Sequence, residues 1–307
     1  MRVIIGARSR GARGVEVDFE GMAAALEASG DYRILRKLQA RAPLAPAETV
    51  GLRLGLFVDV ETTGLDPRHD EIIELAMTRF FYSPDGRVLG LGESFQGFRQ
   101  PDQPIPPEVT AITGITDSMV AGHVIDPGAV SAFAASAAFV AAHNAAFDRR
   151  FLERFSDVFK TKPWACSMSQ IDWAAQGHEG TKLAYLASGA GFFYDKHRAV
   201  NDCAAAIELL SRPLPISGAP ALSVLLEAAR RPTWRIRAEG APFDLKDALK
   251  ARGYRWDDGT RGAPRAWYAD VADADREIDY LRREIYQRDI DIHPVKIDAY
   301  DRFSDRC

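Results

Sequence analysis

The chain has 307 residues, of which 47% are hydrophobic and 27% are charged, and its formal net charge is -4 at neutral pH. These values are ordinary for a globular protein and exclude a strongly basic nucleic-acid-binding protein, so a polyanion would have to be met by local patches or metal ions. The length allows one sizeable core and a smaller appended unit.

The number of cysteines and the length of the apolar runs indicate the cellular compartment. Cys166, Cys203 and Cys307 are far apart and odd in number, which predicts neither a disulfide framework nor a zinc cluster and favours a reducing compartment. No apolar run approaches the roughly 18 residues that cross a bilayer. The apolar part of residues 1–6 is too short for a secretory signal. We therefore expect a cytoplasmic protein without a membrane partner.

Residues 1–50 are expected to form an N-terminal helical extension and linker. Residues 7–14 are rich in Arg and Gly and predict irregular structure. Residues 19–38 predict two helices with a break at positions 30–31, because apolar residues recur there at helical spacing. Two prolines in residues 42–47 predict the linker.

The most informative stretch is an apolar run that begins at Leu52 and contains two acids, Asp59 and Glu61. Strand residues two apart share a face, so these carboxylates are expected to project side by side. Buried carboxylates need a cation, and oxygen ligands favour Mg²⁺ or Mn²⁺. The alternative is a strand end with two solvated acids.

The following residues predict a meander. Residues 70–77 and 80–82 are apolar, residues 83–86 are a turn tetrad, and residues 88–91 are apolar again. Such a pattern predicts an antiparallel hairpin, so three strands open the domain. Residues 108–112 and 129–137 predict short helices.

A strand of small residues at 139–142 is expected to lead into the next helix. Phenylalanines at four-residue spacing from position 147 to 159 predict one buried helical stripe. Asp148 falls in the first turn of this helix, where the helix dipole favours a negative charge. An ordinary acid at a helix start is the alternative for this residue alone.

A later segment pairs His197 with Asp202. Five steps of 100° would place them about 140° apart on one regular helix. We therefore expect His197 on a loop before the helix and Asp202 inside it. A loop-borne imidazole, with its near-neutral pKa, suits proton removal from water. A solvent-exposed histidine beside a helical acid is the alternative.

Three of these segments together resemble the motifs of the DEDDh (DnaQ-like) 3'-5' exonucleases, a family that includes the proofreading epsilon subunit of bacterial replicative polymerases. The motifs are DVETTG at 59–64, HNAAFD at 143–148 and HRAVND at 197–202. Supporting matches occur at 70–75 and 112–116. The resemblance covers about residues 52–212, and no motif residue departs from the pattern.

The resemblance implies an α/β, ribonuclease H-like fold with a mixed five-stranded sheet flanked by helices, over residues 51–231. It implies a two-metal mechanism on the 3' end of DNA, in repair or proofreading, with His197 as the general base. Release of nucleoside monophosphates would follow. The implied ligands of two Mg²⁺ or Mn²⁺ ions are Asp59, Glu61, Asp148 and Asp202.

The resemblance also implies a substrate-binding set. Leu65 would wedge against the last base, and Asn144 would steady the scissile region. His143 could equally be a packed histidine at a strand end. The implied substrate-binding residues are Thr62, Thr63, Gly64, Leu65, Asn144, His143 and Thr113.

Residues 232–307 predict a small α+β domain. Strands are expected at 234–237, 254–256, 266–268 and 293–297, and helices at 243–252 and 274–287. Three of the five tryptophans lie here among basic residues, which can form a stacking platform for single strands. Core filling is the alternative. The basic residues are Arg235, Arg237, Lys246, Lys250, Arg252, Arg255, Arg261 and Arg265.

Three alternatives remain open. An exoribonuclease of the ribonuclease T or oligoribonuclease type would share the chemistry, and the DNA substrate is favoured over it. An inactive nucleic-acid-binding adaptor would keep the fold without turnover. A zinc hydrolase is disfavoured, because the histidines are scattered. A polymerase or repair complex is the macromolecular partner that the resemblance suggests.

Overall fold

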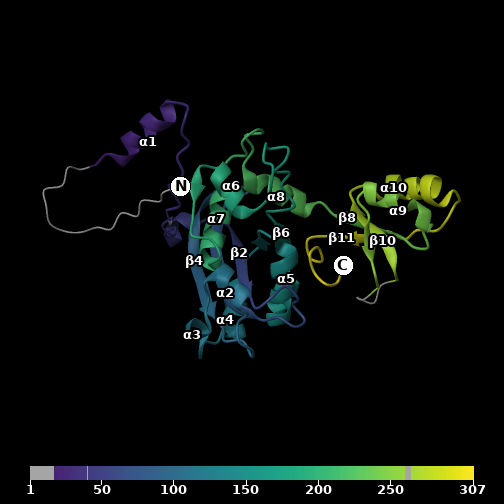
Figure 1. Cartoon of the computed structure of the whole chain (residues 1–307), viewed down its shortest axis with the longest axis horizontal. Coiled ribbons are helices and arrows are strands. Elements are labelled where there is room, and N and C mark those ends of the chain that lie inside the picture. Colours follow the sequence, from purple (N-terminus) through teal and green to yellow (C-terminus); the bar gives the residue numbers. More distant parts are fainter. Residues whose placement is uncertain (1–16, 40, 260–263) are drawn as a thin grey trace.

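The computed structural model describes residues 17–39, 41–259 and 264–307. The start of the chain, the Arg- and Gly-rich stretch at 7–14 and Arg261 lie outside the described residues. Figure 1 shows a central body, with the N-terminal segment on one side and a small C-terminal unit on the other. None of the helices in the described ranges has the length and apolar character that a bilayer crossing requires.

The body is built on a mixed five-stranded sheet in the order β4-β3-β2-β5-β6. Within this sheet β2, β3 and β4 pair antiparallel, and β5 and β6 add in parallel. This arrangement confirms the predicted meander and the predicted mixed five-stranded sheet. The strands are β2 (Arg53–Thr62), β3 (Ile72–Tyr82), β4 (Val88–Phe98), β5 (Phe139–Ala142) and β6 (Trp164–Cys166).

Helices cover both faces of this sheet, which is why β2 and β3 are apolar along most of their length. On one face, Phe57 and Ala76 pack against α6, α7 and α8; on the other, Val58 and its neighbours pack against α4 and α5. Asp59 and Glu61 lie two and four residues after Phe57 on the same strand, so their side chains point to the same face of the sheet, which α7 covers. The helices are α4 (Pro127–Ala135), α5 (Ala145–Phe155), α6 (Leu183–Gly189), α7 (Ala199–Leu210) and α8 (Ala221–Arg230).

Shorter elements complete the body. A small cluster around Ile73, Ile105 and Ile115 seats α2 and α3 against β3. The shorter elements are α2 (Pro107–Thr113), α3 (Asp117–Val120), β7 (Phe192–Phe193) and the 3-10 turns η1 (Pro46–Thr49) and η2 (Asp157–Thr161).

The predicted phenylalanine stripe is partly wrong. Helix α5 ends at Phe155, and Phe159 lies in the separate turn η2. Phe151 and Phe159 are buried, whereas Phe147 and Phe155 are only partly buried. The helix ends because the backbone becomes extended at Ser156.

The N-terminal segment corrects a second prediction. Helix α1 (Phe19–Ala28) forms and buries none of its residues, but the expected second helix does not. Residues 36 and 37 instead make the short strand β1 (Arg36–Lys37), which pairs in parallel with β7. A partner more than 150 residues away decides this conformation, so local helical spacing could not reveal it.

The C-terminal unit is a four-stranded sheet in the order β11-β8-β10-β9 with helices on one face. It matches the predicted strands and helices closely, with β11 at an edge. Its elements are β8 (Thr233–Ala238), η3 (Phe243–Leu245), α9 (Lys246–Ala251), β9 (Arg255–Asp257), β10 (Ala266–Val271), α10 (Ala274–Tyr280), the π-helical segment η4 (Leu281–Tyr286) and β11 (Val295–Ile297).

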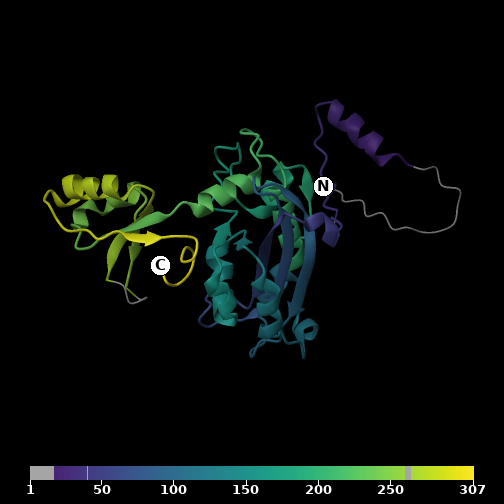
Figure 2. The same cartoon turned by 180° about the vertical axis from the view of Figure 1, so that it is seen from behind.

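After β11 the chain returns to the body, as Figure 2 shows from behind. Arg149 on α5 is fully buried and donates to the backbone carbonyls of Ala299, Tyr300 and Arg302. Arg306 pairs with Glu153 on the same helix at 2.8 Å. The last ten residues, which we call the C-terminal tail, are thus packed on the helix that carries Asp148.

Candidate active site

Strand β2 brings Asp59 and Glu61 to one face of the sheet. The alternating residues Val58 and Val60 are buried on the opposite face. Oxygen atoms of Asp59, Glu61 and Asp202 all lie within 4.8 Å of one another. The fold therefore brings together three of the four carboxylates that the sequence predicts to meet.

Asp202 is fixed in the first turn of α7 by three donors. The hydroxyl of Tyr194 donates to one carboxylate oxygen at 2.8 Å. The backbone N–H groups of His197 and Arg198 donate to the other, at 2.9 and 3.2 Å. These bonds orient the carboxylate toward the strand acids and leave little rotamer freedom.

His197 lies on the loop just before α7, as its spacing from Asp202 predicts. Its backbone has φ of 63°, a left-handed conformation that is unusual for a residue with a side chain. The imidazole is partly exposed and makes no hydrogen bond to other described residues. It is therefore available to a substrate or a water molecule.

Asp148 lies beside the group of three but is not part of it. Its side chain is 3% exposed and accepts a hydrogen bond of 3.2 Å from the backbone N–H of Val60, the residue between the two strand acids. Helix α5 places it in the first turn, as expected. Three predicted ligands thus share one group, and the fourth adjoins it.

The charges of this site are poorly compensated. Burial, together with the nearby carboxylates of Asp148 and Asp202, raises the pKa of Asp59 well above its ordinary value. Burial and the surrounding carboxylates raise the pKa of Glu61 to about 8. Burial raises the pKa of Asp148 to about 7, although the Val60 amide opposes the shift.

Asp202 follows the same pattern, since burial raises its pKa while the Tyr194 hydroxyl opposes the rise. Carboxylates that are held together despite this repulsion favour a bound cation. An all-oxygen donor set fits Mg²⁺ or Mn²⁺ better than zinc. The donor chemistry thus fits a divalent cation held by oxygen ligands.

Glu74 is a residue whose role the sequence analysis missed. It is fully buried on β3 directly opposite Glu61, and it accepts hydrogen bonds from Arg198 and from the backbone N–H of Ala199. The positive charge of Arg198 opposes the rise in the pKa of Glu61, but its guanidinium is paired with Glu74 at 3.1 Å. An acid within the apolar run at 72–77 was the available signal.

Tyr194 was also missed. Burial and the adjacent Asp202 carboxylate raise the pKa of its phenol, so it remains a neutral donor. It precedes Asp202 by eight residues, and no local pattern marks it.

The loop after β2 is held by Asp70. The Asp70 carboxylate accepts from the Thr63 hydroxyl at 3.2 Å and from the Asp66 N–H at 2.8 Å. A Cβ atom on Gly64 would lie 2.5 Å from this carboxylate, so only glycine allows the close approach. Thr62 is buried, and its hydroxyl donates to the Gly64 carbonyl at 2.5 Å.

Leu65, next in this loop, is 82% exposed, as a residue that contacts a substrate base must be. Asn144 is exposed at the start of α5, one turn from Asp148. Both therefore remain candidates for substrate contact.

His143 and Thr113 are engaged within the protein. The two ring nitrogens of His143 lie 2.9 Å from the Ser167 hydroxyl and 2.7 Å from the Thr181 carbonyl. Thr113 is 8% exposed, and its hydroxyl donates to the Val109 carbonyl. These contacts favour structural roles for both residues.

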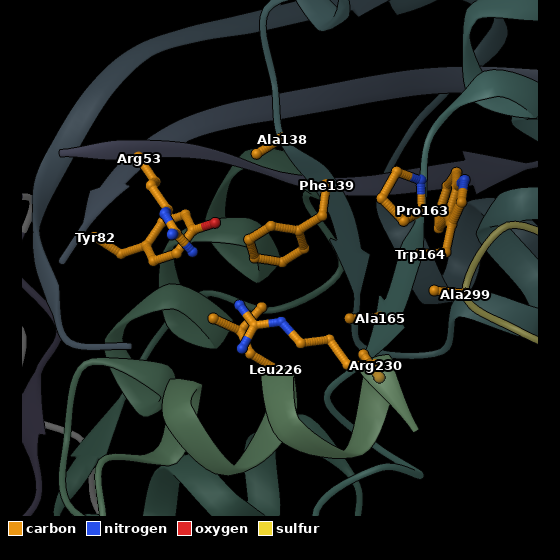
Figure 3. Close-up of a pocket in the computed structure, with 11 residues that line it drawn as sticks. Arg53, Tyr82, Ala138, Phe139, Pro163, Trp164, Ala165, Leu226, Arg230 and Ala299 are labelled. Carbon is orange, nitrogen blue, oxygen red and sulfur yellow. The ribbon is translucent and has the colours of Figure 1, made fainter. Parts of the chain in front are cut away.

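A pocket of about 300 Å³ lies at the other end of the sheet. Figure 3 shows that Arg53 and Arg230 reach into it near Tyr82. Its lining includes Arg53 and Phe139, which begin β2 and β5, whereas the acids lie near the end of β2. The pocket is therefore separate from the carboxylate site.

The known proteins that are similar to this chain match the region that contains the carboxylate site. The exonuclease family model named for RNase T matches residues 56–210. The DNA polymerase III subunit epsilon of Treponema pallidum is 32% identical over 162 residues, which are 50% of this chain and 73% of the relative.

Other relatives are much longer than the matched segment. A DNA polymerase III subunit epsilon-like protein of Rhodobacter capsulatus is 34% identical over 56% of this chain and 25% of its own length. A PolC-type DNA polymerase III of Clostridium perfringens is 31% identical over 50% of this chain and 10% of its own length. The chain thus spans only a tenth to a quarter of these two proteins.

Among solved structures, exonuclease X in complex with 5' overhanging duplex DNA covers 56% of this chain and 99% of its own, with TM-score 0.41 and 24% identity. E. coli exonuclease I in complex with a dA16 oligonucleotide covers 72% of this chain and 63% of its own, with TM-score 0.49 and 17% identity.

Proposed function

We propose, from the premise that this chain belongs to the exonuclease family whose model matches residues 56–210, that it removes nucleotides from the 3' end of DNA and releases nucleoside monophosphates. The observation that supports this proposal most directly is that carboxylate oxygen atoms of Asp59, Glu61 and Asp202 lie within 4.8 Å of one another. Their raised pKa values support a site that binds divalent cations, because a cation would relieve their repulsion.

Two Mg²⁺ or Mn²⁺ ions are the proposed cofactors, held by the carboxylates of Asp59, Glu61, Asp148 and Asp202. When bound, two such ions activate the attacking water and stabilise charge on the leaving oxygen of a phosphodiester. In this proposal Tyr194 and the amide of Val60 hold Asp202 and Asp148 in place.

His197 is the proposed general base. Its imidazole has no hydrogen bond to other described residues, and a ring nitrogen can accept the proton of the attacking water. Its backbone N–H is bonded to Asp202, so the loop is tied to the carboxylate site. The exposed Leu65 is proposed to contact the last base, and Asn144 the adjoining phosphodiester.

DNA is the proposed substrate because the similar proteins named above are DNA polymerase III subunits or subunit-like proteins. A frayed or single-stranded end fits best, since melting a paired end costs a few kcal/mol. We propose that residues 51–231 form the nuclease domain and residues 232–307 a separate domain. The protein is proposed to act in the cytoplasm, alone or in a polymerase or repair complex.

The test is hydrolysis of matched 3'-labelled DNA and RNA strands in Mg²⁺, in Mn²⁺ and in EDTA. We expect stepwise shortening of DNA from the 3' end with metal only, and none with Asp148→Ala. Faster shortening of RNA would transfer the activity to an exoribonuclease. No hydrolysis of either strand, with Asp148→Ala behaving like the parent, would favour an adaptor without turnover.

A further inference from the structure

One surface of the C-terminal unit carries exposed aromatic rings beside lysines. Phe243 in η3 is 75% exposed, and Trp256 on the edge strand β9 is 53% exposed. Core filling accounts for Trp234 and Trp267, which pack against the core of the unit, but not for these two exposed rings. Large exposed rings that are not needed for packing indicate a contact surface.

The rings and lysines form one continuous series. The Lys246 ammonium lies 4.0 Å from the centre of the Phe243 ring, and Lys250 lies 5.8 Å from the Trp267 ring. Lys246 and Lys250 are four residues apart on α9 and so share one helix face. Trp267 contacts Trp256 edge to face at 5.5 Å. We call these five residues the aromatic-lysine strip.

The lysines of the strip are not neutralised by carboxylates as the arginines of this unit are. Arg235, Arg237 and Arg252 pair with carboxylates at 2.7 to 2.8 Å. Lys246 has no ion pair among the described residues, and Lys250 has only a long, exposed contact of 3.9 Å with Asp247. Exposed pairs of this kind contribute little, so both lysines can bind an anion.

We propose that the aromatic-lysine strip binds single-stranded nucleic acid, with bases stacked on Phe243 and Trp256 and phosphates contacted by Lys246 and Lys250. Exposed rings can stack on bases that are not paired in a duplex, and the lysines beside them can contact phosphates. A single strand offers both groups. This inference rests on the proposed exonuclease function, in which the strip would hold the strand at a distance from the end being removed.

Point variants are the appropriate test, because deleting the unit would also remove the C-terminal tail. Buried Arg149 would then lose its carbonyl acceptors, which would destabilise α5. The full-length protein should be used, in EDTA so that no strand is cut. Binding of a labelled 20-nucleotide oligothymidine and of a blunt duplex of equal length should be measured by fluorescence anisotropy over a salt series.

Phe243→Ala/Trp256→Ala is expected to weaken single-strand binding by about tenfold or more, the order of magnitude for losing stacked bases, without changing the salt dependence. Lys246→Gln/Lys250→Gln is expected to reduce the slope of log K against log salt by about 1.4, at about 0.7 for each phosphate contact. Trp256→Tyr should restore most of the affinity, since tyrosine also stacks.

Matched controls are Tyr32→Ala, which removes an exposed ring from the N-terminal segment, and Lys296→Gln, which removes a lysine from β11 outside the strip. Both should bind like the parent. If the two strip variants also do so, the proposal is overturned, and equal losses for duplex and single strand would overturn the single-strand assignment. Hydrolysis of a dinucleotide tests the nuclease separately.

Discussion

The five-stranded sheet of the body and the four-stranded sheet of the C-terminal unit differ in how their acidic side chains are compensated. In the C-terminal unit each of Asp257, Asp270 and Glu277 faces an arginine, and the pairing raises the pKa of Arg252. In the body, four carboxylates surround Asp59, and Arg198, which acts on Glu61, is itself paired with one of them, Glu74. Removing one member of a compensated pair should cost stability, whereas uncompensated carboxylates favour binding of a cation or a proton.

The largest expected effect is that of Asp59→Asn, which removes one of the uncompensated carboxylates of the body. Hydrolysis should fall by more than the roughly 10²- to 10⁴-fold typical of a lost general base, because the variant lacks a proposed metal ligand. The melting temperature without metal should stay level or rise, since a desolvated carboxylate is gone. Thermal melts with and without Mg²⁺ would check this.

Asp270→Asn is the matched control in the small sheet. It leaves Arg235 and Arg255 without their carboxylate, so the melting temperature should fall while hydrolysis of a dinucleotide is retained. A fall in stability for Asp59→Asn comparable with that for Asp270→Asn would contradict the contrast between the sheets.

His197→Gly should reduce single-turnover hydrolysis by about 10²- to 10⁴-fold, the usual contribution of a general base. Glycine is the informative replacement because the backbone at this position has φ of 63°, which glycine adopts without strain. The Mg²⁺-induced rise in melting temperature should persist. Its loss would show that the imidazole supports metal binding instead of proton transfer.

Glu74→Gln should raise the Mg²⁺ concentration for half-maximal hydrolysis by about 10- to 100-fold, as expected for a residue that supports metal ligands. The change frees the charge of Arg198 beside Glu61. Gln96→Ala, which removes only a neutral donor to Glu74, is the control and should have a small effect. Equal effects of both variants would count against an electrostatic role.

The metal-free protein should lose stability as the pH rises from about 4.5 to 8. The folded-state pKa values of Glu61 and Asp148 are raised to about 8 and about 7, so the folded state binds more protons than the unfolded state in this range. Melting temperature should fall by at least about 3 °C, a loss of roughly 1 kcal/mol, and saturating Mg²⁺ should remove the slope. A rising melting temperature in EDTA would refute the assignment.

The effect of Glu277→Gln in the C-terminal unit should be confined to stability. Glu277 is 6% exposed and accepts from Arg252 and Tyr254, so the substitution should cost about 1.5–3 kcal/mol, as for hydrogen bonds to a charged group. Denaturant melts would measure it. Hydrolysis of a dinucleotide should be unchanged, and a loss there would mean that this unit contributes to the active site.

Local patterns carried most of the prediction. The alternation around Asp59 and the turn at 83–86 depend on neighbouring residues only, so β2 to β4 could be read from the sequence. The carboxylate group was predictable because each motif lies at the end of a strand or the start of a helix.

Contacts over long sequence separations could not be predicted in this way. Strand β1 depends on β7, and the burial of Arg149 depends on carbonyl groups 150 to 153 residues further along the chain. The pairing of Glu74 with Arg198 spans 124 residues. Amphipathic periodicity reports only which face of an element is apolar, so it is silent on such partners.

The return of the C-terminal tail to α5 means that the small unit is anchored at both of its ends. A single protease cut between α8 and β8 would leave two fragments joined through Arg149 and Arg306, and they should elute together on gel filtration.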